Sequence, residues 1–268
     1  MIRLMGTAMA LILAPAMALA GGAPERASDT WPMLSAQIWP DAEIADGDAM
    51  IRIDAPTRAE DAALVPFDVA MAPGNGRIVR SMTIIVEENP APVAAEFTFS
   101  ERMGREFRIS TRLRVERYSN IRVVAELDDG SLIEAARYVK ASGGCAAPAV
   151  KDAEAALASL GRMKLREFAG DELPAGMAEA QVMMRHPNNS GFQIDQVSLL
   201  HIPAFFVHEM AVTAEGEPLF TVTGGISLSE DPTIRFTYPE TGARTLEVTA
   251  KDTDGGIYSN RFDLGNQS

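Results

Sequence analysis

The stretch FRISTRLRV, residues 107–115, places apolar side chains at every second position except Thr111. Phe107, Ile109, Leu113 and Val115 fall on one side of an extended chain, and the three arginines fall on the other. This alternation is typical of a strand that buries one face and leaves the other in water. The stretch therefore predicts β-structure.

Segments with the same period fill most of the first half of the chain. We expect strands at 51–54, 65–69, 78–86, 94–99, 107–115, 121–127 and 132–139. Asp128-Asp129-Gly130-Ser131 separates the last two and is a hairpin signal. A partly helical entry segment, 28–49, precedes these strands, and its residues Trp31 and Trp39 are expected to anchor it. Short strands at near-regular spacing predict a β-sandwich.

The period changes between residues 148 and 161. Val150, Ala153, Leu157 and Leu160 recur at helical spacing, and Gly161 is a helix stop signal. Residues 146–161 are therefore expected to form a helical linker. Strands resume at 163–168, 178–185, 205–214, 219–223, 233–238, 245–251 and 257–264. The predicted fold is all-β, with two immunoglobulin-like β-sandwich domains, 28–145 and 162–264, joined by the short helical linker.

Charge and the N-terminal residues define the expected environment. The 268-residue chain has a formal net charge of −13, which argues against binding to nucleic acid phosphates. Residues 1–20 have the features of a cleavable signal peptide: a basic Arg3, an apolar stretch, and the small-residue pattern Ala18-Leu19-Ala20. No later run is long enough to span a membrane. We therefore expect an exported, periplasmic protein without a membrane span after signal cleavage.

Cys145 is the only cysteine in the chain, and it lies at the junction of the two predicted domains. An unpaired cysteine in an exported protein indicates intermolecular pairing or a free reactive thiol. Gly143 and Gly144 precede it, and they are expected to give the segment flexibility. A helix beginning near Pro148, together with Lys140 and Arg137, would lower the pKa of an exposed Cys145 thiol. Burial as an inert cysteine is the alternative.

Other motifs point to no cofactor. His186, His201 and His208 match no metal-ligand spacing, and a turn-capping role is expected for His186. Asp252-Thr253-Asp254-Gly255-Gly256 resembles the start of a calcium loop but lacks its closing glutamate, so a hairpin turn is expected. No glycine-rich loop joins a strand to a helix in the pattern of a phosphate site. We expect neither metal nor nucleotide.

Several of these stretches together resemble a known family. The run Tyr138 to Cys145 looks like the C-terminal end of SoxY, the sulfur-carrier subunit of the bacterial thiosulfate-oxidising system. The residues from Gly161 onward resemble its partner SoxZ, with matching features at His186-Pro187, at 202–206 and in the hairpin at 248–264. The order of the two parts, with a signal peptide, is similar to the quinoprotein dehydrogenase-associated SoxYZ-like carriers.

The resemblance implies a non-enzymatic carrier that binds sulfur intermediates covalently on Cys145. Its partners would be Sox-type sulfur-oxidising enzymes or a quinoprotein dehydrogenase system. Here Ala146 and Ala147 replace the two glycines that follow the family's cysteine, and the chain continues into a second domain, so the arm is tethered at both ends. Two alternatives remain: an accessory module of a periplasmic quinoprotein (PQQ-dependent) dehydrogenase with Cys145 incidental, and an enzyme with Cys145 as nucleophile, for which no base is evident.

Overall fold

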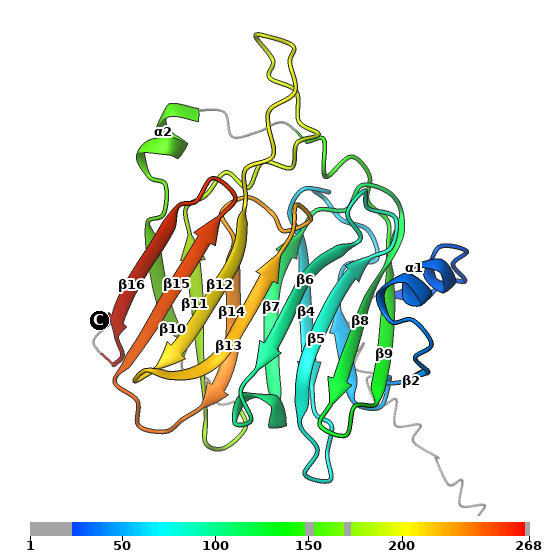
Figure 1. The fold of residues 1–268 in the computed structure, drawn as a ribbon, viewed down its shortest axis with the longest axis vertical. Helices are drawn as coiled ribbons and strands as arrows, with labels where there is room; N and C mark the ends of the chain where they lie inside the picture. Colours follow the sequence, from blue (N-terminus) through cyan, green and yellow to red (C-terminus); the bar gives the residue numbers. More distant parts are fainter. Residues whose placement is uncertain (1–22, 148–152, 169–172, 266–268) are drawn as a thin grey trace, which may run out of the picture.

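Two stacked β-sheets make up the protein in a computed structural model, which describes residues 23–147, 153–168 and 173–265 (Figure 1). The first domain contains β1 (Ala23–Pro24), α1 (Trp31–Ile38), β2 (Ile44–Asp46), β3 (Ile51–Asp54), β4 (Val65–Met71), β5 (Val79–Val86), β6 (Val93–Phe99), the 3-10 turn η1 (Met103–Arg105), β7 (Phe107–Leu113), β8 (Ser119–Leu127) and β9 (Leu132–Val139). The linker contains α2 (Ala153–Ala158), and the second domain contains β10 (Met163–Phe168), β11 (Met177–Met184), β12 (Val207–Ala214), β13 (Glu217–Gly224), β14 (Thr233–Pro239), β15 (Thr245–Asp252) and β16 (Ile257–Asp263). The predicted all-β, two-domain fold is confirmed.

The two domains share both sheets, which the sequence did not predict. The ten-stranded sheet runs β1-β9-β8-β5-β6-β13-β12-β15-β16, with β2 added in parallel to β9. The six-stranded sheet runs β10-β11-β14-β7-β4-β3. The domains therefore meet at two antiparallel pairs, β6–β13 and β7–β14. Backbone hydrogen bonds across these pairs therefore connect the domains in addition to the linker. They also leave no free sheet edge at the junction.

Aromatic side chains fill the core where the domains meet. Phe97 packs against Phe220 with ring centroids 5.8 Å apart, and Phe220 packs edge-on against Phe236 at 5.0 Å. These three residues belong to a single buried cluster that contains residues of both domains. The two domains therefore form one continuous hydrophobic core. Burial of each ring in it stabilises the fold by a few kcal/mol.

Details of individual elements agree with the sequence or correct it. The hairpin turns at 128–131 and 252–256 form as predicted, and the second is stabilised by the Asp252 carboxylate, which accepts hydrogen bonds from two backbone N–H groups of the turn. The expected strand at 205–214 begins only at Val207. Of the linker helix, the structure describes Ala153–Ala158, and the predicted start at Pro148 lies outside the described residues, as does the signal peptide.

The N-terminal segment covers the outer face of the first domain. Helix α1 packs Leu34 against Ile85, Val124 and Leu132 of the ten-stranded sheet. Its Trp31 contacts Trp39 edge-on at 6.4 Å, which confirms that the tryptophans anchor this segment. Consequently β8 is buried on both faces, and its outward-facing residues need partners within the protein.

Arg122 of β8 has the greatest need for such partners, because its charged side chain is only 1% exposed. It pairs with the equally buried Glu87 at 2.8 Å and with Glu134 at 3.1 Å, and its guanidinium lies 4.2 Å from the ring centroid of Trp31. We expect Arg122→Met to lower the free energy of unfolding by about 3–5 kcal/mol, because Glu87 would remain buried and unpaired. Urea unfolding measures this loss.

A double variant provides the control for this prediction. Arg122→Met combined with Glu87→Leu should recover much of the lost stability, because the fully buried Glu87 charge is removed and Glu134, with 21% of its side chain exposed, keeps contact with water. A loss below about 1 kcal/mol for Arg122→Met alone would contradict the prediction, since that is the range of an exposed ion pair.

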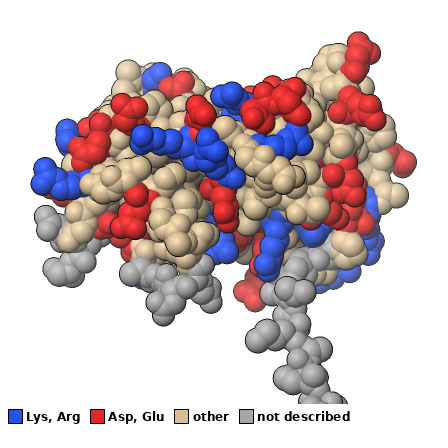
Figure 2. All heavy atoms as spheres, turned by 90° about the horizontal axis from the view of Figure 1, so that it is seen from below, with Lys and Arg blue, Asp and Glu red and all other residues tan. Residues whose placement is uncertain are grey.

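The end of the molecule seen in Figure 2 carries charges of both signs. Lys and Arg side chains alternate there with Asp and Glu, and no single-sign field covers the face.

Candidate functional site

Cys145 lies in a short turn that follows β9 and packs against the loop between β7 and β8. The Gly143 N–H donates to the Glu116 carbonyl at 2.9 Å, and the Gly144 N–H donates to the Val115 carbonyl at 3.1 Å. The backbone of residues 143–145 is therefore held along the edge of this loop, and the position of the cysteine is set by main-chain contacts before its own side chain is considered.

Both domains hold the backbone of Cys145 itself. Its N–H donates to the Glu116 carboxylate at 2.9 Å, within the first domain. Its carbonyl accepts a hydrogen bond from the hydroxyl of Ser190, which belongs to the second domain. The Ser190 N–H in turn donates to the side-chain oxygen of Gln193 at 2.9 Å, and both of these side chains are buried. The backbone of Cys145 is thus fixed at the interface between the two domains by hydrogen bonds to both.

The thiol is fully buried, with 0% of the residue exposed. Burial, together with the nearby Glu116 carboxylate, raises its pKa to about 11, and Arg114 opposes the shift. The expectation of an exposed thiol with a lowered pKa is therefore wrong for this conformation. Desolvation of the thiolate outweighs any stabilisation from the expected helix, and the charges that act on the thiol are those of Glu116 and Arg114 rather than Lys140 and Arg137.

The two glycines have different roles. Gly143 has a positive φ of +83°, is exposed, and has no heavy atom within 4 Å of the position of an added Cβ. Gly144 is buried, and a Cβ there would overlap the carbonyl of Ala62 and lie 2.7 Å from the backbone nitrogen of Val115. Gly143 thus fits the expected pivot, whereas Gly144 allows close backbone packing that holds the segment in place.

Arg114 connects this site to the second domain. Its guanidinium donates to the Leu228 carbonyl at 2.6 Å, and its backbone N–H donates to the Ser227 carbonyl at 2.8 Å. Asn89 supports the same loop by donating to the Arg114 carbonyl at 2.7 Å and by accepting a hydrogen bond from the Glu116 N–H at 2.7 Å. Although burial lowers the pKa of Arg114, the group stays cationic because an arginine pKa lies far above neutrality.

The sequence did not identify Glu116, Arg114 or Ser190 as site residues. Strand alternation predicted that Arg114 faces water, yet it is only 2% exposed, because residues 226–228 of the second domain cover it. For Ser190 the sequence predicted no role. No local signal marks either residue, since the contact that gives each its role crosses between domains.

His186 is the histidine for which the sequence predicted a structural role. His186 is buried and its Nδ1 accepts a hydrogen bond from the Asn188 N–H at 3.1 Å, which is the turn-capping role that was predicted. Burial lowers its pKa, although Asp252 lies 3.6 Å from its Nε2. Within residues 23–147, 153–168 and 173–265, no three His, Cys, Asp or Glu side chains gather as metal ligands.

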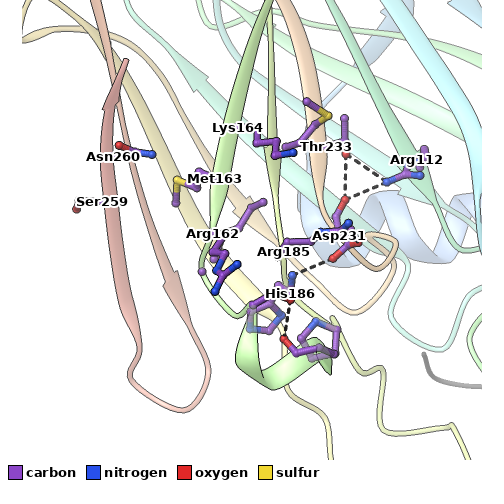
Figure 3. A pocket seen from close by; sticks show the side chains of 16 residues that line it. Arg112, Arg162, Met163, Lys164, Arg185, His186, Asp231, Thr233, Ser259 and Asn260 are labelled. Carbon is purple, nitrogen blue, oxygen red and sulfur yellow. Dashed lines mark hydrogen bonds and ion pairs between the residues drawn. The ribbon is translucent and has the colours of Figure 1, made fainter. Parts of the chain in front are cut away.

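A basic cavity of about 1040 Å³ lies beside His186, lined mostly by the second domain and also by Arg112 of β7 in the first (Figure 3). Four cationic side chains line it, those of Arg112, Arg162, Lys164 and Arg185. Asp231 is the single acidic side chain in its lining, and it pairs with Arg185. The cavity therefore has a positive local charge in an acidic protein, which favours anions over cations.

Comparison with known proteins gives matches for both domains. Residues 35–145 match the family model of sulfur oxidation protein SoxY, and residues 168–263 match that of sulphur oxidation protein SoxZ. The first match ends at Cys145 itself. A search of curated proteins finds no match to the chain.

Two solved structures show similarity to part of the chain. The sulfur carrier protein SoxY from Chlorobium limicola f thiosulfatophilum is 28% identical over 42% of this chain and 91% of that chain, with a TM-score of 0.34. A superoxide reductase (neelaredoxin) variant from Ignicoccus hospitalis is 16% identical over 34% of this chain and 78% of that chain, with a TM-score of 0.27.

Proposed function

The chain belongs to the SoxY and SoxZ families of sulfur oxidation proteins, one domain of each in a single polypeptide, and we propose that it carries sulfur intermediates covalently on Cys145. The observation that supports this most directly is the end of the SoxY match at the only cysteine of the chain. SoxY and SoxZ proteins are carriers rather than catalysts, so the prediction of a non-enzymatic protein is confirmed at the level of the family. Partner enzymes of a sulfur-oxidising system would act on the bound group.

The buried thiol represents a closed resting state in this proposal. Four hydrogen bonds hold the segment: those donated by the N–H groups of residues 143, 144 and 145, and the one that Ser190 donates to Cys145. At roughly 1 kcal/mol each, they hold the segment closed by about 4 kcal/mol, so roughly one molecule in a thousand is open. Gly143 is the pivot, because its surroundings leave space for the backbone to move.

The loading chemistry needs the open state. Once exposed, the thiol returns to an ordinary pKa near 8.5 and provides thiolate at neutral pH. The thiolate attacks a sulfur atom of an S–S donor, so that a new S–S bond forms on Cys145 while the donor's own S–S bond breaks and a thiolate leaves with its electron pair. This exchange consumes no oxidant, and the carried species remains removable by a reductant.

The proposal also covers where the protein is located and where its two domains begin and end. We propose that residues 1–20 direct export to the periplasm, where the carrier would meet its partners. The proposed limits, 28–145 and 162–264 with a linker at 146–161, contain the ranges matched by the two family models. No helix among the described residues is long and apolar enough to cross a membrane.

Intact mass spectrometry tests the proposed function. Protein purified from its native host during growth on reduced sulfur should carry additional mass that a reductant removes, and Cys145→Ala should carry none. Protein that remains unmodified under these conditions would contradict the carrier role, provided that the purified chain accepts the thiosulfate group of tetrathionate in vitro. In that control the Cys145 thiolate displaces thiosulfate from tetrathionate, so the atoms and electrons balance.

The complete burial of Cys145 favours one alternative, a non-catalytic accessory module of a periplasmic quinoprotein dehydrogenase. In that case the thiol would be a packed core residue, and Cys145→Ala would leave the host's dehydrogenase phenotype intact. Loss of sulfur-dependent growth in the same variant would instead support the carrier.

A further inference from the structure

An exposed hairpin projects from the second domain beyond the end of both sheets (Figure 1). We call residues 192–204 the apolar hairpin. Half of the large exposed hydrophobic side chains among the described residues, five of ten, lie within it: Phe192 42%, Ile194 44%, Val197 94%, Leu199 74% and Leu200 69% exposed. Such clustering of exposed apolar side chains marks an interaction site, whereas single exposed ones do not.

The apolar hairpin is ordered by its own hydrogen bonds. Its two arms are joined at Ile194 and His201, and the Asp195 N–H donates to the Leu200 carbonyl at 2.9 Å. The Asp195 carboxylate accepts a hydrogen bond from the Ser198 N–H at 2.7 Å, which closes the tip and contributes to a lowered pKa of Asp195. The exposed side chains are therefore presented on a preformed scaffold, which reduces the entropy lost on binding.

The base of the apolar hairpin is the part of the second domain that holds Cys145. Gln193 belongs to the hairpin, and its side chain positions Ser190, whose hydroxyl donates to the Cys145 carbonyl. The Ser190 hydroxyl also accepts a hydrogen bond from the Phe192 N–H at 3.2 Å. A displacement of the hairpin would thus act directly on one of the four hydrogen bonds that keep Cys145 closed.

We propose that the apolar hairpin is the docking surface for the enzyme that loads the sulfur group onto Cys145, and that docking loosens the Ser190 contact and opens the segment. This inference rests on the proposed carrier function. The partner must present an apolar cleft beside its active site, because the hairpin offers apolar side chains and the thiol lies at its base. Lipid is a poor fit, because residues 192–204 contain no Lys or Arg and Asp195 is anionic.

The first test compares loading in cells. The triple variant Val197→Ser, Leu199→Ser, Leu200→Ser in the native host should carry at least roughly tenfold less reducible adduct on Cys145 than the native chain, since truncating apolar anchors weakens docking by this order or more. Ile257→Ser is the matched control, because Ile257 is 69% exposed on β16, as exposed as Leu200. It should load as the native chain does.

Chemical loading separates a docking defect from a damaged site. Tetrathionate needs no partner, so the purified triple variant and the native chain should accept its thiosulfate group at the same rate. Equal adduct in cells for the triple variant and the native chain would overturn the docking proposal while leaving the carrier function intact. Absence of adduct from both chains in cells would instead contradict the carrier function, on which the docking proposal rests.

Two further measurements address the partner and the coupling. A photo-crosslinking residue at position 199 should join the chain to the enzyme that loads Cys145, and crosslinks solely to a second copy of this chain would overturn the assignment. Ser190→Ala in the purified protein should raise the alkylation rate of Cys145 by roughly 2- to 10-fold, the effect of losing one hydrogen bond on an opening equilibrium. An unchanged rate would overturn the coupling of the hairpin to the thiol.

Discussion

Cys145 in the native protein will react with iodoacetamide at pH 8 roughly 100-fold more slowly than the same thiol in urea-unfolded protein, or slower still. The thiolate is the reacting species, and burial raises the pKa of the native thiol to about 11, against about 8.5 for a free cysteine. Each pH unit below the pKa lowers the thiolate fraction tenfold. The native rate should therefore keep rising through pH 9 and 10, where the unfolded rate has already levelled off.

The same shift affects stability. Because the folded pKa lies above the unfolded one, the contribution of the neutral buried thiol is fully present below about pH 8.5 and is lost as the pH rises toward 11. Glu116→Gln is a matched variant: it removes the negative charge while its side-chain oxygen can still accept the hydrogen bond from the Cys145 N–H. It should lower the pKa of the thiol. A native rate that levels off near pH 9 would contradict the closed state.

Gly144→Ala should expose the thiol and bring its alkylation rate toward that of unfolded protein, an increase of up to roughly 100-fold. A Cβ at this position overlaps the backbone of Ala62, which is half-buried and packs against the core, and that of Val115, which is fully buried and cannot move aside. Residues 143–145 will instead move away from the loop between β7 and β8, because only four hydrogen bonds hold them there. Alkylation kinetics followed by mass spectrometry measure this effect.

Gly143→Ala is the control for that substitution. Its Cβ points into open space, so it introduces no overlap, and the cost of about 1 kcal/mol comes from the positive φ alone. Its alkylation rate should change by less than about tenfold. If Gly144→Ala instead reacts as slowly as the native protein, then the close packing of residue 144 does not keep the thiol buried.

The sequence predicted much of the fold because its signals are local. Alternation in 107–115 defined a strand, and the turn residues at 128–131 and 252–256 defined hairpins, all of which form. Shared sheets were not predictable in this way. The pairing of β6 with β13 joins segments more than 100 residues apart, and either strand would show the same period at the edge of a separate sandwich.

The properties of the candidate site likewise fall into those that the sequence determined and those that depend on tertiary contacts. The sequence alone determined that there is one thiol, that two glycines precede it, and that it ends a SoxY-like domain. Only the tertiary structure decided that this thiol is closed, because its burial depends on Glu116 in one domain and Ser190 in the other. Side-chain alternation reports which face of a strand is apolar, but it cannot report what a second domain will cover. The desolvation that raises the pKa of Cys145 is a property of that covering contact.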